Sequence, residues 1–284
     1  LFDIGNRNKY SLNVYSNKES DSFDTIANII YPDTIDDCFD NENGDVPGIK
    51  DDNDNWSRRG HKDRIIHITE NELRVFAKLF DSSNKWEEGR LPSIHCESFV
   101  KILSKFSDVN NSILGNNSSS FATVCWDETG AQENNIIKRE VDFPNSRYNL
   151  ILSGPHIGIA NPLFQSSQRN CSTHRAFDNI DLNYIGSNVY QRCNYKYLSE
   201  LELYLSKGPQ TPWKTNYIDE YKILSRKMLN LAGERTLISA ILPPGSSHTN
   251  GLFGIAYKNL NTLSLVAGYM ASICYDFVVK TLGA

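Results

Sequence analysis

The sequence predicts an α+β fold of short mixed strands and packed helices. Residues Thr236–Leu242 form an apolar, β-branched run that Pro-Pro-Gly stops at 243–245, which is typical of a buried strand ending at a loop. The segment Thr69–Glu72 has the form of a capping box, in which a threonine hydroxyl and a glutamate carboxylate satisfy free amides at a helix start. Strands and helices follow one another without the regular rhythm of a doubly wound sheet, so the α+β class is favoured.

The first sixty residues are predicted to be an acidic connecting segment. A strand-like piece at Leu1–Ile4 is followed by residues 21–55, which are rich in Asp, Asn, Gly and Pro and show little periodicity. Arg64–Ile68 has the pattern of a strand.

The helix that begins at the capping box Thr69–Glu72 is expected to run to about Phe80. Its buried face is expected to carry Leu73, Phe76, Leu79 and Phe80.

Apolar spacing places the remaining elements. Pro92 is expected to open a second helix, and residues 107–120 form an Asn- and Ser-rich loop. Steps of three and four residues between apolar side chains predict amphipathic helices at Tyr195–Leu205 and Tyr217–Leu231, and Leu260–Leu282 is expected to be a long C-terminal core helix. Short apolar runs bounded by turn residues predict further strands at Phe121–Trp126, Tyr148–Leu152 and Ile180–Ile185.

Composition and charge limit the class of protein. A chain of 284 residues with 39% hydrophobic and 11% aromatic content can bury one large core or two smaller ones, and this is not the composition of a disordered chain. The net charge of −5 is concentrated at the front, because residues 1–60 hold 13 Asp and Glu against 6 Lys and Arg, whereas the remainder holds 21 against 23. Any nucleic-acid surface must therefore be a local patch.

The cysteines and the apolar C-terminal run exclude two further classes. Six widely spaced cysteines give no Cys-x-x-Cys motif and no Cys/His cluster at zinc spacing, so structural zinc is not expected. Reduced, buried cysteines in a cytoplasmic protein are favoured over a secreted disulfide protein, which the sequons at Asn110 and Asn116 would otherwise suit. Leu263–Val279 is interrupted by polar residues and is shorter than the roughly 20 residues of a membrane span, so no membrane partner is expected.

Several blocks of the sequence resemble, in order, the target recognition region of type IIG-like restriction-modification enzymes, which join an adenine methyltransferase to its recognition domain. The C-terminal block combines the strand and turn at 233–245 with the polar loop 246–251 and the apolar run 260–282. Within that run, residues 263–277 are similar to the core helix of TaqI-like and type I specificity domains. Earlier matching blocks lie at residues 1–7, 46–50, 55–56, 59–68, 121–132, 137–140, 151–156 and 160–164.

This resemblance implies a domain organisation and a function. Residues 1–60 would connect to a preceding methyltransferase domain, and residues 61–284 would be the target recognition domain. The partners would be double-stranded DNA and that methyltransferase domain, which would bind S-adenosylmethionine as the cofactor of the parent protein. The fragment itself would hold no cofactor and catalyse nothing, and whether the parent also cleaves DNA stays open.

DNA recognition needs side chains that reach phosphates and base edges. Arg and Lys suit guanine and phosphate, whereas Asn and Gln suit adenine. The expected loops carry such groups, most densely at residues 165–170. The candidate DNA-binding residues are Arg58, Arg59, Lys62, Gln132, Asn134, Lys138, Arg139, Gln165, Gln168, Arg169, Arg175, His248 and Asn250.

Other functions stay open on particular residues. Asn161–Phe164 approximates the Asn-Pro-Pro-aromatic motif of amino-methyltransferases, but its third position is Leu and the Gly-containing segment 153–158 lies too close to be an independent donor-binding unit. Adjacency of His95 and Cys96 does not make a nucleophile and base. Trp126–Thr129 and His156 either aim polar groups at DNA or tie loops down within the fold, and the second interpretation is slightly favoured. A structural or protein-interaction spacer is the remaining alternative.

Overall fold

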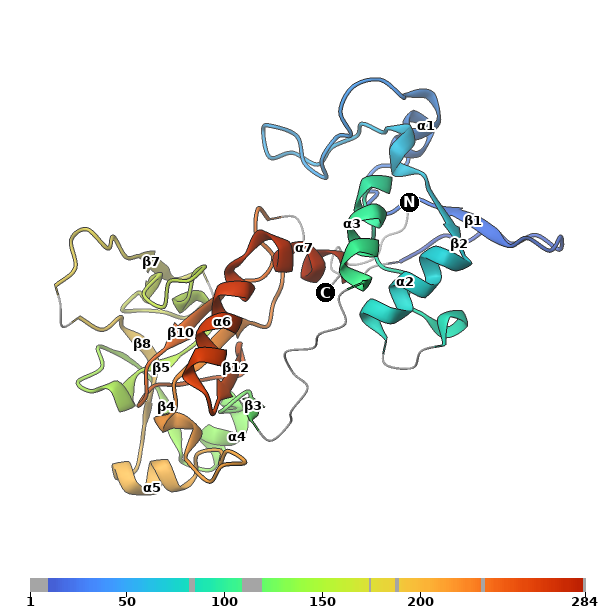
Figure 1. The fold of residues 1–284 in the computed structure, drawn as a ribbon. Coiled ribbons are helices and arrows are strands. Elements are labelled where there is room, and N and C mark those ends of the chain that lie inside the picture. The colour runs from blue at the N-terminus through green and yellow to red at the C-terminus, as the bar shows by residue number, and fades with distance from the viewer. Residues whose placement is uncertain are drawn as a thin grey trace. The chain divides into compact units, whose positions relative to one another are not determined.

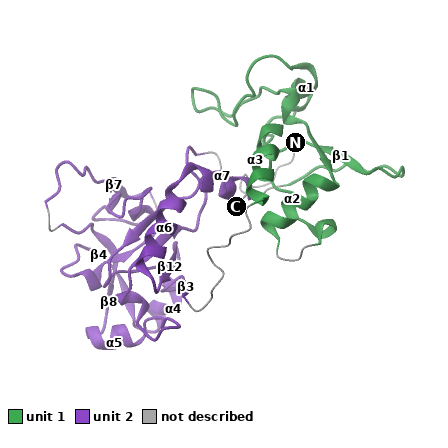
Figure 2. Cartoon of the chain, viewed as in Figure 1, with its two compact units in different colours: residues 1–108 green, residues 109–284 purple. Residues whose placement is uncertain are grey.

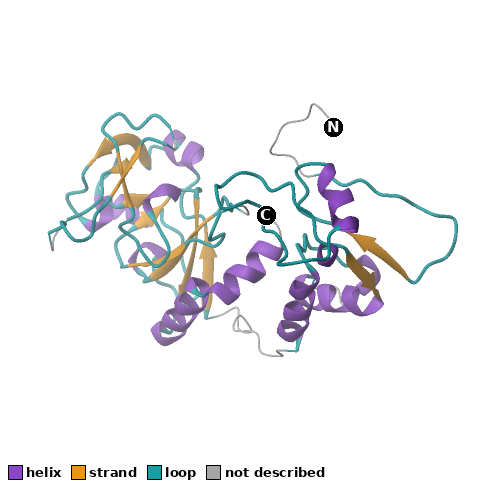
Figure 3. Ribbon diagram, turned by 90° about the horizontal axis from the view of Figure 1, so that it is seen from above, coloured by secondary structure: helices purple, strands orange, loops and turns teal. Residues whose placement is uncertain are grey.

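The computed structural model describes residues 10–81, 85–108, 119–173, 175–186, 189–230 and 233–282. The chain forms two compact units, residues 1–108 and 109–284, which are coloured separately in Figure 2. Most of the strands belong to the second unit (Figure 3). Helices together with several small sheets confirm the predicted α+β class. The strand expected at Leu1–Ile4 and most of the loop expected at 107–120 lie outside the described residues.

The acidic segment is part of unit 1, so the unit boundary does not fall at the predicted position after residue 60. Strand β1 (Ser22–Thr25) pairs antiparallel with β2 (Ile66–Thr69). The buried guanidinium of Arg64 donates to the carbonyl oxygens of Arg59, Ala27 and Asn28 at 3.0–3.3 Å. The bonds to Ala27 and Asn28 join residues 61–108 to the segment before them within unit 1, whereas the sequence predicted a recognition domain that begins at residue 61.

The helices described in unit 1 are α1 (Asp33–Asp40), α2 (Glu70–Phe80) and α3 (Glu97–Ser107). The capping box at the start of α2 is confirmed: Thr69 Oγ1 accepts from the amide of Asn71, and the Thr69 amide donates to Glu72 Oε2 at 2.9 Å. The expectation that Pro92 opens a helix is wrong. Cys96 has an extended backbone with φ −153°, so α3 begins at Glu97.

Unit 2 is built on two four-stranded sheets and a hairpin (Figure 1). The first sheet has the strand order β10-β9-β12-β3, the second has the order β11-β5-β8-β4, and β6 pairs with β7. The strands are β3 (Ser120–Thr123), β4 (Ile137–Asp142), β5 (Ile151–Leu152), β6 (Gln165–Ser167), β7 (Phe177–Asn179), β8 (Cys193–Tyr197), β9 (Lys222–Arg226), β10 (Ser239–Leu242), β11 (Ser247–His248) and β12 (Leu252–Tyr257). The helices are α4 (Glu128–Glu133), α5 (Leu201–Ser206), α6 (Leu260–Ala271) and α7 (Ile273–Leu282).

The core of unit 2 joins both sheets. Leu152 of the second sheet packs in one cluster with Leu224, Leu242 and Leu252 of the first, and all four side chains are fully buried. On the first sheet, α6 packs through Leu263, Val266 and Met270 against Ile223 and Tyr257. The first of these clusters therefore packs the two sheets against each other.

Several predicted elements of unit 2 need correction. The segment 195–205 is the end of strand β8 followed by the short helix α5. In place of the amphipathic helix predicted from Tyr217, residues 217–230 contain a 3-10 turn at Tyr217–Asp219 and then strand β9. Residues 180–185 hold no strand, because the hairpin partner of β6 is β7 at 177–179. Pairing with neighbouring strands decides these segments, and apolar spacing alone does not reveal such pairing.

The long C-terminal helix is broken. Ser272 adopts an extended backbone with ψ 150°, and α6 and α7 meet at 68°. Among the helices described, no single one is long and apolar enough to cross a membrane, although this bent pair passes the same test by length and composition alone.

Candidate nucleic-acid interface

The densest group of predicted DNA-binding residues lies on the β6–β7 hairpin and the loop that joins its strands. The pairing sets Gln165 opposite Asn179, Ser166 opposite Asp178, and Ser167 opposite Phe177. Beyond the strands, the amide of Gln168 donates to the carbonyl of Ala176 at 3.0 Å. We call residues 168–173 and 175–176 the hairpin loop. It carries three of the predicted residues: Gln168, Arg169 and Arg175.

His156 supports this hairpin from inside the unit. Its Nδ1 accepts from the amide of Ser153 at 2.9 Å, so the proton lies on Nε2, which is 3.1 Å from both Ser167 Oγ and the carbonyl oxygen of Arg192. Burial lowers the pKa of His156 to about 4, which keeps the ring neutral. The favoured interpretation, in which this histidine ties loops together, agrees with these contacts.

Two arginines fasten the hairpin to the second sheet. Arg139 of β4 donates to the carbonyl oxygen of Cys171 at 2.6 Å, and its guanidinium lies 5.8 Å from the ring centre of Tyr195. Arg192, just before β8, donates to the carbonyl oxygen of Ser167 at 2.9 Å. Because each arginine holds a backbone carbonyl, the hairpin is anchored at Ser167, just before the loop begins, and again at Cys171 near the middle of the loop.

The hairpin loop itself carries two arginines that have no partner among the described residues. Arg169 and Arg175 are exposed, and neither guanidinium has a hydrogen bond or ion pair with any residue that the structure describes. The sequence from 138 to 196 holds seven Lys and Arg against four Asp and Glu. The hairpin loop therefore presents unneutralised positive charge on an anchored backbone, which is the arrangement that binds phosphate oxygens.

The two predicted glutamines of the hairpin have partners on the opposite strand. Gln165 Nε2 donates to Asn179 Oδ1 at 2.8 Å, and Gln168 Nε2 donates to Asp178 Oδ1 at 2.8 Å. Both bonds lie at the protein surface, so each amide keeps hydrogen-bonding groups that face solvent.

The predicted residues near α4 and β4 are exposed or half-buried but mostly engaged locally. Gln132 Nε2 donates to the Glu128 carbonyl at 2.9 Å, and Asn134 Nδ2 donates to the Gly130 carbonyl at 2.7 Å, so both finish the short helix α4. Lys138 forms an ion pair with Glu140, which Lys196 of β8 also contacts. Of this group, only Arg139 bonds directly to the hairpin loop among the residues that the structure describes.

The three predicted residues of unit 1 lie in a more acidic setting. Arg58 stacks over the Tyr31 ring at 4.0 Å and lies 3.7 Å from Asp33, and Lys62 bonds Glu42 at 2.9 Å. Arg59 is exposed, and its side chain has no hydrogen bond, ion pair or ring contact with the described residues. These cations belong to a different unit from the hairpin loop.

His248 does not fit the prediction of a base reader, because it is completely buried. Its Nε2 lies 3.0 Å from the Tyr217 hydroxyl, and burial lowers its pKa to about 3. The reason is that β11 pairs in parallel with β5 and draws the polar segment 246–249 inside the unit. Asn250 is half-buried at the following turn and accepts from Lys227 Nζ at 2.6 Å.

The same buried region contains a lysine. Lys222 is fully buried, and its ammonium group donates to the carbonyl oxygens of Ile218 and Ser246 at 2.9 and 2.7 Å. Burial lowers the pKa of Lys222 to about 8. Trp126 is also internal, where its indole donates to Tyr204 Oη, and Asp127 caps α4 through the amide of Gly130. These polar groups make their contacts within the fold.

The motif Asn161–Phe164 forms a local turn. Asn161 Oδ1 accepts from the amide of Leu163 at 2.9 Å, and the ring of Phe164 packs against Gly158. Among the described residues, no group of three or more His, Cys, Asp or Glu side chains is placed to hold a metal ion. All six cysteines are free, and Cys274 is exposed.

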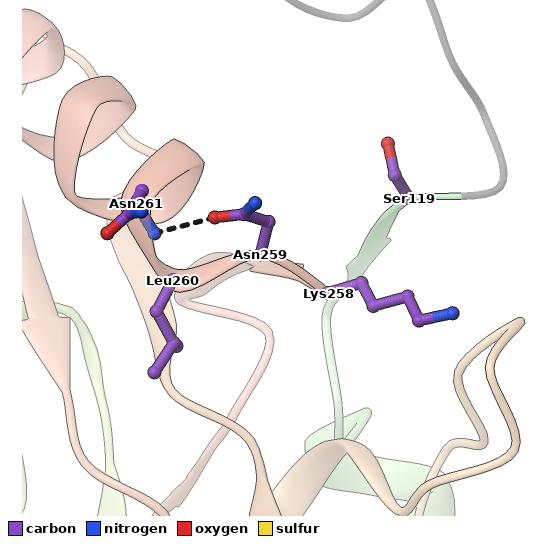
Figure 4. A pocket seen from close by; sticks show the side chains of 5 residues that line it. All are labelled: Ser119, Lys258, Asn259, Leu260 and Asn261. Atoms are coloured by element: carbon purple, nitrogen blue, oxygen red, sulfur yellow. Dashed lines mark hydrogen bonds between the residues drawn. The ribbon is translucent and has the colours of Figure 1, made fainter.

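A surface depression of about 490 Å³ lies elsewhere in unit 2, at the start of α6 (Figure 4). Its lining residues are Ser119, Lys258, Asn259, Leu260 and Asn261. The Asn259 side chain faces Asn261 and accepts from its amide at 2.8 Å, so it caps the helix. The depression contains neither Asn161 nor a glycine, and it does not resemble a nucleoside pocket.

Sequence reasoning missed two residues at the hairpin: Arg192, which anchors it, and Asp178, which holds Gln168. Arg192 precedes a segment that was predicted to be helical. Asp178 lies in the three-residue strand β7, whereas the predicted strand lay further along the chain, at 180–185. The polar turn at 168–176 between two short runs was the available hairpin signal.

Comparison with protein-family models, with curated proteins and with solved structures found no match to this chain.

Proposed function

We propose that this chain binds duplex DNA through the hairpin loop, as the target recognition region of an adenine-specific restriction-modification methyltransferase. The observation that carries the DNA-binding part is the pair of free guanidinium groups, Arg169 and Arg175, on a loop that Arg139 and Arg192 anchor. The ordered sequence blocks that resemble type IIG-like enzymes support the wider assignment. Under this proposal, S-adenosylmethionine is held by a methyltransferase domain that acts as the partner of this chain.

Anchoring matters for the strength of binding. Backbone that is held by hydrogen bonds, as at Ser167 and Cys171, loses less conformational entropy when DNA binds, so more of the ionic attraction appears as affinity. Phosphate contacts give sequence-independent binding that weakens as salt rises, because bound cations displace counterions from DNA. Unit 2 has 15 Lys and Arg against 13 Asp and Glu, so this local cluster, and not the net charge, must provide the attraction.

The test is a titration of the chain with a labelled duplex at several salt concentrations. The variants Arg169→Gln and Arg175→Gln remove one cation each from the hairpin loop. The matched controls Lys207→Gln and Lys214→Gln remove one exposed cation each from the region of α5, which lies at the opposite end of unit 2 from β7 (Figure 1). Each arginine change should weaken binding and lower the slope of log K against log salt by about 1.

The possible outcomes are clearly separated. Salt-sensitive binding that falls in the arginine variants and persists in the lysine variants supports the proposal. Absence of salt-sensitive binding by the unaltered chain would favour a structural or protein-interaction module. Equal losses in all four variants would place the DNA contact outside the hairpin loop.

A further inference from the structure

We propose that Gln168 is a base-reading residue that selects adenine in the major groove, and that Asp178 is the positioning residue that orients it. This inference rests on the proposed function and goes further, because it assigns a base preference to one side chain. It starts from the 2.8 Å bond between Gln168 Nε2 and Asp178 Oδ1.

The bond fixes which way the Gln168 amide points. An ionised carboxylate only accepts hydrogen bonds, so the atom of Gln168 that faces Asp178 must be the amide nitrogen. The carbonyl oxygen Oε1 is thereby directed away from Asp178. An unrestrained surface glutamine would exchange these two ends freely, whereas this one presents a defined edge.

The hairpin directs the side-chain amide of Gln168 toward solvent. Ser167 and Phe177 are paired in register and face inward, where Ser167 contacts His156 Nε2 and the Phe177 ring meets the His156 ring at 5.1 Å. Successive residues of a strand point to opposite faces. Gln168 and Asp178, which follow these two residues, are both exposed.

The groups left on Gln168 match adenine better than the other bases. Asp178 occupies one of the two N–H donors, which leaves one N–H donor and the acceptor Oε1. Adenine offers the complementary pair in the major groove, the acceptor N7 beside the donor N6 amino group. Guanine offers two acceptors there, so Oε1 would face an acceptor. The neighbouring free cations Arg169 and Arg175 offset the negative charge of Asp178 as it approaches DNA.

The experiment selects duplexes from a randomised library with the complete chain and sequences the bound fraction. The unaltered chain should enrich adenine at one position on the order of 5- to 100-fold, the range expected for one bidentate contact. Gln168→Ala should abolish that enrichment while salt-dependent binding persists. Gln168→Glu should shift it toward cytosine, because a carboxylate accepts from the cytosine amino group. Gln210→Ala, at an exposed glutamine before the Asn216 turn, is the matched control.

Asp178 is tested by the same readout. Asp178→Ala should lower the adenine enrichment without weakening total binding at low salt, since it removes a negative charge. Asp178→Asn, whose Oδ1 still accepts from Gln168, should restore part of the preference. A merely structural role for Asp178 would change the amount of DNA bound and leave the base preference as it was.

Failure of this inference differs from failure of the proposed function. If the chain binds DNA with a salt dependence set by the hairpin arginines but shows no adenine preference, or keeps it in Gln168→Ala, the role assigned to Gln168 is wrong and the DNA-binding function stands. Enrichment of guanine that Arg169→Gln removes would likewise contradict only the role of Gln168. If no salt-sensitive binding occurs, the proposed function itself fails.

Discussion

Replacing Gly254 by alanine should destabilise unit 2 severely. Gly254 lies in β12, directly beneath the hydrogen bond between Tyr217 Oη and His248 Nε2. A Cβ atom at this position would overlap Tyr217 Oη and lie 2.6 Å from His248 Nε2, both far inside contact distance. Tyr217 and His248 are both fully buried, so neither ring has free space into which to move.

The expected loss is about 2–6 kcal/mol of unfolding free energy. Forcing an extra carbon into a packed core costs about 1–3 kcal/mol. Separating two buried polar groups costs about 1–3 kcal/mol more, because neither finds water in exchange. Since a domain is stable by only about 5–15 kcal/mol, the loss is a large fraction of the total.

Urea unfolding of the complete chain measures this loss, and Gly268→Ala provides a control of opposite sign. Gly268 lies in α6, where an added Cβ atom would have nothing within 4 Å, so alanine there should stabilise by about 1 kcal/mol through helix propensity. If Gly254→Ala does not fold, Tyr217→Phe alone and combined with it gives a second measurement. Removing the hydroxyl should relieve part of the clash, so the double variant should be more stable than Gly254→Ala alone. Equal midpoints for Gly254→Ala and the unaltered chain would refute the packing argument.

Three further expectations follow from buried or capping groups. Burial lowers the pKa values of His156 and His248 to about 4 and about 3, whereas in the unfolded chain both bind protons at the ordinary pKa of 6.5. The free energy of unfolding should therefore be highest above pH 6.5 and should fall below it, by about 2 kcal/mol per histidine at pH 5. Equal urea midpoints at pH 7.5 and pH 5 would contradict the burial of these histidines. Asp276 is 3% exposed and accepts from the amides of Thr236 and Leu237, so Asp276→Ala should cost about 2–5 kcal/mol in the same urea assay, and a cost near zero would disprove the contact. Thr69→Ala removes the N-cap of α2 and should lower the melting temperature of unit 1 through a loss of about 1 kcal/mol. Ser57→Ala, at a half-buried loop residue whose hydroxyl accepts only a 3.3 Å bond from the Arg59 amide, should lower it less.

What the sequence could predict depended on how local the cause is. The start of α2 follows from Thr69 and Glu72, three residues apart, and the strand before Pro243 follows from an apolar run and its stop signal. The segment 217–231 has helix-like spacing, yet β9 forms there because it lies between β10 and β12 in the sheet. Such pairing is a property of distant residues, and a local pattern does not contain it.

The candidate site divides in the same way. The abundance of Gln and Arg at 165–175 was visible in the sequence, and those residues do share one hairpin. That Arg139 and Arg192 would hold this loop depends on the placement of β4 and β8, which nothing local specifies. The prediction for His248 was wrong because a short polar segment is typical of a surface loop, whereas its pairing with β5 places it in the interior.

The strand pairing of unit 2 also bears on how the chain reaches this state. Ser120 pairs with Tyr257, and Ile151 pairs with Ser247, so both sheets are completed only by the last part of the chain. Contacts between residues so distant in sequence make folding slow, because a large loop must close before they form. During synthesis, β3 and β5 leave the ribosome long before their partners, and their unpaired edges stay open to association with other chains until the C-terminal third arrives.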